Sequence, residues 1–496
     1  MSEPNDQTII RMQKLEKIKS LGVDAYPYSY DRSGSISDAV KEFESSEKTG
    51  RKQKLAGRIM AFRRQGKTAF GNIKDISGRI QIYVRKDSIG EEKYDLFKCF
   101  EIGDIIGVEG ELFRTHTGEI TVNVADFKIL AKAVLPLPVP KEKIVNGKKE
   151  VYDEFRDIEL RYRQRYLDLI LNEKVMETFI LRAKIIQSVR NFLIGKNFIE
   201  VETPTLQNIY GGASARPFET HHNALDMKLY LRISNELYLK RLITGGMEKV
   251  FEFVKDFRNE GIDRTHNPEF TQVEFYQAYA DYNTMMELFE KIYSQAASEV
   301  LGKTKITYQG KEIDLTPPWK RMAFMDALSE LGGINTQDCA DDELKQLMKK
   351  HEIEFKGDFN RGLAFNALFE KLCEHKLIQP TFITDFPIET TPLCKPHRNK
   401  PALVERFEPY IAGWEVGNAY SELTDPILQR KLLEAQVERG RGGEEDTHPM
   451  DEDFVRSMEF GMPPTGGVGI GIDRMVMLLT DSYSIRDVIL FPLMRP

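Results

Sequence analysis

The stretch from Phe257 to Tyr279 constrains the fold more than any other part of the sequence. The segment VFEFVKDFR alternates apolar and polar residues, and a loop rich in Gly, Asp, Asn and Pro separates it from a second alternating run, EFTQVEFYQAY. This pattern predicts an antiparallel hairpin. Since alternate strand residues share a face, the second strand carries a ring, an amide, a carboxylate and a phenol in one row: Phe270, Gln272, Glu274 and Tyr276. Such a row is typical of a binding-cleft floor, although a hairpin with solvated charges remains an alternative.

Three segments together resemble the motifs of one enzyme class. FRNEG, HNPEFT and the E-x-Y after them resemble motif 2 of the class II aminoacyl-tRNA synthetases, in the form found in lysyl-tRNA synthetases. GGVGIGIDR resembles motif 3, and the helical pattern over 175–194 with FIEVETPTL resembles motif 1, the homodimer interface of that class. The resemblance covers nearly the whole chain. It implies an α+β protein with an N-terminal OB-fold β-barrel and a class II antiparallel-sheet catalytic domain flanked by helices.

Length and composition limit the remaining possibilities. A chain of 496 residues is too long for one core, so two or three domains are expected. We expect no membrane segment, because no apolar run is long enough to span a bilayer and the start carries no signal-peptide pattern. Four widely separated cysteines without CxxC spacing favour a reduced, cytoplasmic setting over a zinc site. The net charge of −7 argues mildly against nucleic-acid binding but permits a local basic face.

Pattern changes along the chain predict its domain organisation. An N-terminal amphipathic helix and lead-in occupy 1–50, and an OB-fold anticodon-binding domain occupies 51–135. A proline-rich and then polar linker covers 136–160. The class II catalytic domain covers 161–496, with an insertion at about 282–375 in which helical patterns dominate.

The OB-fold prediction has its own candidate binding residues. Five short strand patterns and one helical stretch lie between Lys54 and Leu130, and a small barrel of this kind binds oligonucleotides on one face. Basic side chains near Arg63, a ring for stacking and polar groups for base edges suit single-stranded RNA, although an ordinary barrel surface is the alternative. In the resembling subclass a Phe, a Gln eleven residues later and a Glu in a TGE turn read the anticodon. The predicted anticodon residues are Arg63, Phe70, Gln81 and Glu119.

A second group of residues suits a nucleotide with its metal ion. Neither a P-loop nor a GxGxxG fingerprint is present. Arg258, Arg474 and His266 suit a triphosphate, and Phe270 suits adenine. Glu408 and Glu415 lie in a strand-like stretch and suit the Mg²⁺ that accompanies ATP. Glu415 shares a face with Asn418 and Glu422 only if a bulge lies near Gly417.

The resemblance assigns further roles in this nucleotide site. It implies that the catalytic Arg258 bridges the substrate carboxylate and the α-phosphate, that Glu260 meets the adenine amine, and that the catalytic Arg474 lies against the nucleotide. The predicted ATP-binding residues are Arg258, Glu260, His266, Asn267, Phe270 and Arg474.

The remaining carboxylates predict a pocket for a cationic side chain. Glu274 and Glu422 with the Tyr276 phenol suit an ammonium group, whereas an aspartate pocket would require Arg or Lys. The resemblance implies that Gly212 and Glu236 hold an α-amino group. The predicted lysine-binding residues are Gly212, Glu236, Glu274, Tyr276, Asn418 and Glu422. The expected reaction is lysine activation by ATP, with release of pyrophosphate, followed by lysyl transfer to the 3′ end of tRNA(Lys) by a homodimer.

One departure from the family pattern and two alternative functions qualify this hypothesis. The family usually reads T-R-H-N-P-E-F, but here Arg264 precedes Thr265, so the family's role for that arginine is not carried over. A protein-lysine-modifying relative would lack the anticodon barrel. A non-catalytic paralogue would be expected to lose motif arginines or metal carboxylates, yet Arg258, Glu408, Glu415 and Arg474 are all present.

Overall fold

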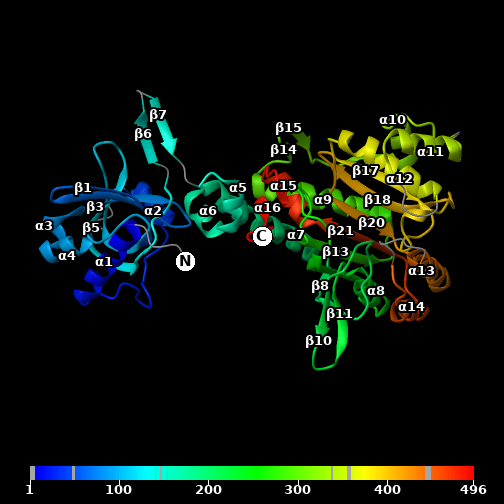
Figure 1. The fold of residues 1–496 in the computed structure, drawn as a ribbon, viewed down its shortest axis with the longest axis horizontal. Helices are drawn as coiled ribbons and strands as arrows, with labels where there is room; N and C mark the ends of the chain where they lie inside the picture. The colour runs from blue at the N-terminus through cyan, green and yellow to red at the C-terminus, as the bar shows by residue number, and fades with distance from the viewer. Residues whose placement is uncertain are drawn as a thin grey trace. The chain divides into compact units, whose positions relative to one another are not determined.

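The computed structural model describes residues 6–46, 51–139, 141–145, 148–152, 155–336, 339–354, 359–441 and 448–495. Contacts divide the chain into two units, Met1–Asp157 and Ile158–Pro496 (Figure 1). None of the helices in these described ranges combines the length and the apolar composition that crossing a bilayer requires.

The first unit is built on a closed five-stranded barrel, as the OB-fold prediction requires. Its strands are neighbours in the order β1-β2-β3-β5-β4. Ile80, Ile82 and Val84 alternate with more exposed residues along β3, and so fill the interior. The bounds are α1 (Asp6–Ser20), α2 (Ile36–Ser46), β1 (Gln53–Gln65), β2 (Thr68–Lys74), β3 (Arg79–Arg85), α3 (Lys86–Ile89), α4 (Glu91–Phe97), β4 (Ile105–Arg114) and β5 (Ile120–Ala131).

Polar contacts hold helix α1 against the barrel. Arg11 is buried and donates hydrogen bonds to the carbonyl oxygens of Ile102 (2.9 Å) and Ala133 (3.2 Å). Close by, the fully buried Lys132 ammonium pairs with the Asp104 carboxylate at 2.8 Å. After the barrel, β6 (Lys141–Val145) and β7 (Lys148–Tyr152) form a hairpin within the range expected to be a linker.

The second unit is organised around a nine-stranded sheet. Its order is β16-β17-β18-β20-β21-β13-β12-β8, with β19 beside β18, and all neighbours are antiparallel except β16–β17 and β12–β8. This agrees with the predicted antiparallel-dominated α+β catalytic domain. The bounds are β8 (Ile199–Glu200), β12 (Lys249–Phe257), β13 (Glu269–Ala278), β16 (Lys320–Ala323), β17 (Thr381–Pro387), β18 (Leu403–Ile411), β19 (Trp414–Glu415), β20 (Gly417–Ser421) and β21 (Thr465–Gly471).

Helices flank this sheet and bury one of its faces. On β13, Val273 and Phe275 belong to a core shared with helices α7, α9 and α15, while the alternate residues face the other way. The helices are α5 (Ile158–Arg163), α6 (Arg165–Leu171), α7 (Glu173–Gly195), α8 (Glu236–Thr244), α9 (Tyr282–Leu301), α10 (Phe324–Glu330), α11 (Asp341–Lys350), α12 (Arg361–Leu372), α13 (Pro426–Arg441), α14 (Glu452–Glu459), α15 (Ile472–Leu479) and α16 (Ile485–Val488), with short 3-10 turns at Glu374–Lys376 and Ile388–Thr390.

The range expected to be a helical insertion, 282–375, is more mixed than its pattern indicated. Helix α9 packs on the sheet, and strand β16 joins the sheet beside β17. A separate hairpin is formed by β14 (Lys305–Tyr308) and β15 (Lys311–Asp314). Outside this range, β9 (Leu206–Gln207), β10 (Glu219–His222) and β11 (Met227–Leu231) form a small three-stranded sheet.

Candidate functional site

The uncovered face of the central sheet borders a cavity of about 490 Å³. Every residue predicted to bind ATP, lysine or metal lines this cavity, although these residues come from distant parts of the chain. They are Gly212, Glu236, Arg258, Glu260, His266, Asn267, Phe270, Glu274, Tyr276, Glu408, Glu415, Asn418, Glu422 and Arg474.

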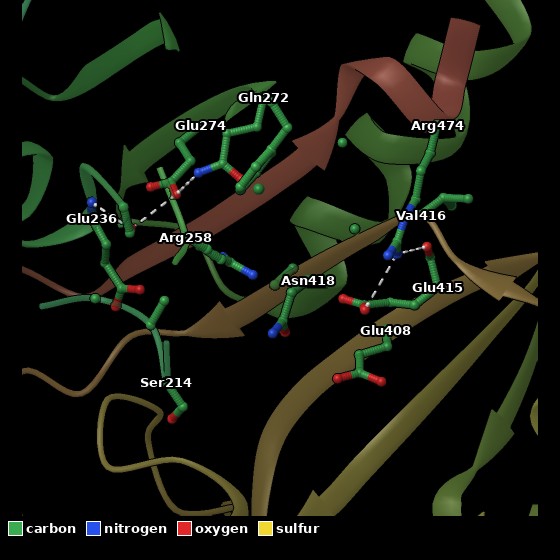
Figure 2. Close-up of a pocket in the computed structure, with 18 of the residues that line it drawn as sticks. Ser214, Glu236, Arg258, Gln272, Glu274, Glu408, Glu415, Val416, Asn418 and Arg474 are labelled. Atoms are coloured by element: carbon green, nitrogen blue, oxygen red, sulfur yellow. Dashed lines mark hydrogen bonds and ion pairs between the residues drawn. The ribbon is translucent and has the colours of Figure 1, made fainter. Parts of the chain in front are cut away.

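The cavity has two ends of different chemistry. In Figure 2, Glu236 and Glu274 lie at one end, whereas Glu408, Glu415 and Arg474 lie at the other. Arg258 and Asn418 lie between the two groups. We call the first the acidic end, formed by Glu236, Glu274, Tyr276 and Glu422, and the second the phosphate end.

Strand β13 supplies the floor of the acidic end. Glu274 is buried, and its carboxylate accepts hydrogen bonds from Ser234 Oγ (3.1 Å), Gln272 Nε2 (2.6 Å) and Tyr276 OH (3.2 Å). Burial raises the pKa of the Glu274 carboxyl well above its usual range, and the nearby Asp256 and Glu236 carboxylates add to the shift. A buried carboxylate among like charges is a site where an ammonium group is favoured.

Glu422 completes the acidic end from β20's side of the sheet. It is 1% exposed, and its carboxylate pairs with a buried lysine ammonium, that of Lys240. Burial raises the pKa of Glu422 to about 8. Its close approach to Tyr276 depends on Gly467, since a Cβ atom on Gly467 would collide with both side chains.

Lys240 on helix α8 was not found by sequence reasoning. Its ammonium is fully buried and pairs with the Glu236 carboxylate at 2.5 Å and with the Glu422 carboxylate. Burial alone would lower the pKa of Lys240, but Glu236 and Glu422 together raise it above its usual range, so the group stays charged. In the sequence LYLKRL this lysine looks like an ordinary charge on an amphipathic helix.

Two motif arginines line the cavity, Arg258 between its two ends and Arg474 at the phosphate end (Figure 2). The Arg258 guanidinium lies over the Phe270 ring, 5.0 Å from its centroid. Arg474, in the first turn of α15, donates to the Glu415 carbonyl oxygen, and its Nη2 lies 3.3 Å from His266 Nε2. These cationic groups and the partly exposed Phe270 ring lie where a nucleoside triphosphate and its base would need them.

Several carboxylates lie at the same end of the cavity as Arg474, whose Nη1 is 3.7 Å from Glu415 Oε2 (Figure 2). Glu408 Oε2 accepts a hydrogen bond from Tyr410 OH at 2.6 Å, and the other oxygen pairs with Arg406. Glu370 of α12 and the adjacent Glu374 also line the cavity, and neither was predicted. Burial raises the pKa of Glu374 to about 8, and the charges of Glu370, Glu408 and Glu415 add to the shift.

The carboxylates on this side suit a metal ion that other ligands help to hold. No group of three or more His, Cys, Asp or Glu residues in the described ranges is arranged to hold a metal on its own. Mg²⁺ in nucleotide sites takes one or two protein carboxylates and completes its shell with phosphate and water oxygens. Two glutamates facing a phosphate site therefore fit Mg²⁺ delivered with ATP.

An irregularity brings Glu415 and Asn418 to the same cavity. β19 ends at Glu415 and β20 begins at Gly417, so the strand is interrupted at Val416. Val416 N donates to the Pro409 carbonyl (2.9 Å), and its own carbonyl accepts from Gly471 N (3.2 Å). The bulge that the sequence predicted at Gly417 therefore lies one residue earlier, at Val416.

Arg264 lies outside the cavity lining. Its guanidinium lies between the rings of Trp414 and Tyr483, 5.1 Å and 4.9 Å from their centroids, and its carbonyl accepts a hydrogen bond from Ile485 N. Thr265 and His266 line the cavity in its place. The shifted arginine therefore packs against the aromatic residues that flank the hairpin loop.

The barrel brings together its four predicted residues, three on the neighbouring strands β1, β2 and β3 and Glu119 in the turn before β5. Arg63 is opposite Phe70 in the β1–β2 pair, and Gln81 Nε2 donates to Glu119 Oε2 at 2.8 Å. The sequence reasoning missed Tyr83, whose ring stacks on Phe70 with centroids 4.4 Å apart and an angle of 22° between planes. Because Phe70 is 36% exposed, its ring remains accessible to a base.

Comparison with known proteins agrees with this architecture. The family model for class II tRNA synthetases (D, K and N) matches residues 157–495, and the model for the OB-fold nucleic acid binding domain matches residues 53–130. The chain belongs to the class II tRNA synthetases of this D, K and N group.

The relatives narrow the similarity to one member of that group. A protein named lysine–tRNA ligase from Thermoanaerobacter sp. (strain X514) is 50% identical over 496 residues, which is 100% of this chain and 97% of the relative. Another lysine–tRNA ligase, from Staphylococcus aureus (strain MW2), is 49% identical over 501 residues, with 99% of each chain covered.

Proposed function

We propose that this enzyme is a lysine–tRNA ligase: it activates L-lysine with ATP, releases pyrophosphate, and transfers the lysyl group to the 3′ end of tRNA(Lys) for protein synthesis. The observation that carries the proposal is the buried acidic end beside an arginine-lined phosphate end in one cavity. An aspartate or asparagine side chain would bring no positive charge to Glu274 and Glu422.

The acidic end binds the amino acid. Glu274, Tyr276 and Glu422 receive the ε-ammonium group, and Asn418 lies beside them on the cavity wall. Glu236 receives the α-ammonium group, and Gly212 lets the backbone approach it closely: its φ is +86°, and a Cβ there would collide with Ser234 and Glu236. A neutral amino acid would leave buried carboxylates without a partner and would be rejected.

The phosphate end binds ATP. Arg258 bridges the lysine carboxylate and the α-phosphate, Phe270 stacks the adenine and Glu260 meets its amino group. Arg474, His266 and Asn267 hold the rest of the nucleotide. Glu408 and Glu415 would hold Mg²⁺, which neutralises phosphate charge when it is bound.

The chemistry follows from how these groups hold the substrates. The lysine carboxylate attacks the α-phosphorus in line, and pyrophosphate leaves as lysyl-adenylate forms. No protein nucleophile is required, because orientation and the neutralisation of charge by Arg258 and Arg474 lower the barrier. The terminal ribose hydroxyl of tRNA then attacks the lysyl carbonyl, and AMP leaves.

The other parts of the chain have supporting roles in this proposal. The OB-fold domain at 51–135, after the lead-in at 1–50, reads the anticodon through Arg63, Phe70, Gln81 and Glu119. The linker at 136–160 joins it to the catalytic domain at 161–496. The enzyme works as a homodimer through α7 and the strand that follows it, and four buried free cysteines suit the cytoplasm.

ATP–pyrophosphate exchange, measured with each of the twenty amino acids in turn, tests the proposal. Lysine should support exchange, and aspartate and asparagine should not. Exchange driven by aspartate or asparagine but not by lysine would overturn the proposed specificity, and no exchange with any amino acid would overturn the proposed activity.

A further inference from the structure

The acidic end contains a positive charge supplied by the protein itself, the ammonium group of Lys240. Lys240 is 0% exposed, and its ammonium lies between the carboxylates of Glu236 and Glu422. Its other polar contact is a long one, 3.5 Å to the Leu393 carbonyl oxygen. The two glutamates come from different elements, the start of α8 and the residue after β20, so Lys240 joins two walls of the pocket.

A charge count shows why this position matters. With the two ammonium groups of lysine bound, all three carboxylates of the acidic end (Glu236, Glu274 and Glu422) are ionised, and with the Lys240 ammonium they sum to two negative charges. Lysine carries two ammonium groups, and its carboxylate is assigned to Arg258. Buried charges are tolerated only where they are balanced, so the pocket with Lys240 matches the two ammonium groups, whereas without Lys240 it carries one negative charge too many.

We propose that Lys240 is a positioning residue for lysine recognition: its buried ammonium holds the Glu236 and Glu422 carboxylates in place and leaves the acidic end with the charge that lysine neutralises. The inference rests on the proposed lysine pocket. Lys240 does not line the cavity, so it would act on a bound lysine through Glu236 and Glu422, which do.

The titratable groups that face Lys240 add no positive charge, and the Arg406 guanidinium beyond Tyr420 pairs with Glu408. Cys394 and His448 face it, and burial, with Lys240 adding, lowers the pKa of His448 to about 4, so this imidazole is neutral. Burial raises the pKa of the Cys394 thiol well above its usual range. Tyr276 and Tyr420 also face the glutamates, and burial raises both phenol pKa values, so they stay neutral as well.

Removal of this charge has a consequence that depends on pH. Lys240 lowers the pKa of both Glu236 and Glu422, so without it burial and mutual repulsion would raise the pKa of both carboxyls further and keep them protonated to a higher pH. Lysine would then bind only after these protons are lost. The affinity for lysine should therefore be weak at pH 7 and should recover as the pH rises and the carboxyls ionise.

The test compares Lys240→Met, which keeps the length of the side chain but removes its charge, with Lys240→Arg, which keeps the charge. We expect Lys240→Met to raise the KM for lysine in ATP–pyrophosphate exchange on the order of 100-fold at pH 7, with little change in the KM for ATP. The ratio of variant to wild-type KM should fall steadily from pH 7 to pH 9. Lys240→Arg should restore part of the lysine affinity.

Lys132→Met is the matched control. Lys132 is also a fully buried lysine paired with a carboxylate, but it lies in the barrel beside Asp104. This variant should lower the thermal unfolding temperature and leave the KM for lysine unchanged at every pH. A ratio for Lys240→Met that does not depend on pH would show a merely structural role and would overturn the inference.

A double variant keeps the inference testable if Lys240→Met folds poorly. Lys240→Met with Glu422→Gln removes both charges of the pair, so it should fold and should bind lysine no worse than Glu422→Gln alone. Additive losses in the double variant would contradict the proposed coupling. If the wild-type enzyme shows no lysine-dependent exchange, the proposed function itself fails, which is a different result from a normal wild type with an unaffected Lys240→Met.

Discussion

Replacement of Glu422 by Gln isolates one charge of the acidic end. The substitution preserves the size of the side chain, so the changes expected are the loss of the charge and of its attraction for an ammonium group. Glu422 is 1% exposed and pairs with Lys240, so water cannot replace the lost interaction. Removing one partner from a buried charge interaction costs about 3–5 kcal/mol.

A cost of that size has a measurable kinetic equivalent. At about 1.4 kcal/mol for each factor of ten, kcat/KM for lysine should fall by roughly 100-fold to 4,000-fold. The proposed ATP site lies at the other end of the cavity, around Arg474 (Figure 2), so the KM for ATP should change by no more than about twofold, an effect well under 1 kcal/mol.

The assay is ATP–pyrophosphate exchange with lysine and ATP varied separately. Losses of similar size for both substrates would refute the assignment of Glu422 to the amino acid. A loss confined to ATP would refute it more strongly, because it would place this carboxylate at the phosphate end.

Three further predictions follow from the same geometry. Burial raises the pKa of Glu422 to about 8, so between about pH 4.5 and 8 the folded protein keeps a proton that the unfolded chain releases. The stability that this proton contributes is complete below about pH 4.5 and is lost as the pH rises through 8. The unfolding temperature of the ligand-free enzyme should therefore fall over this window, and should fall less in Glu422→Gln. Arg258→Ala should raise the activation free energy of exchange by about 3 kcal/mol and so lower kcat over 100-fold, because a hydrogen-bond donor to the transition state is lost. Phe70→Ala should raise the KM for tRNA about tenfold in aminoacylation, since base stacking is worth about 1–3 kcal/mol, and should leave exchange unchanged.

The parts of the fold that were predictable have strong local signals. The alternation in β12 and β13 and the loop between them defined the hairpin and its polar row, and every predicted residue of the catalytic site lines one cavity. The barrel was predictable for the same reason, because short alternating strands separated by glycine turns have few other solutions.

The residues that were missed depend on contacts that a sequence pattern does not contain. Lys240 lies on an amphipathic helix where a surface lysine is ordinary, and its burial depends on Glu422, almost two hundred residues away. Glu370 and Glu374 follow a helical pattern without chemical content, and reach the cavity only because α12 packs near β18. Strand β16 is four residues long and pairs with a distant strand, β17, so tertiary contacts outweigh its weak local signal.

The strand interruption at Val416 was predictable only in part. Glycine at position 417 correctly indicated an irregular strand, because glycine in a strand often marks a bulge. It did not indicate which residue leaves the ladder, since that depends on the hydrogen bonds of Val416 to Pro409 and Gly471.

The most direct measurement is the ratio of kcat/KM for lysine to that for norleucine in ATP–pyrophosphate exchange. Norleucine has nearly the shape of lysine but lacks the ε-ammonium group. If buried carboxylates select the side chain by its charge, lysine should be preferred by roughly 10⁴-fold or more, because norleucine leaves them without a partner. A preference of about tenfold or less would mean that the shape of the cavity selects the substrate, and would contradict the role of Glu274 and Glu422.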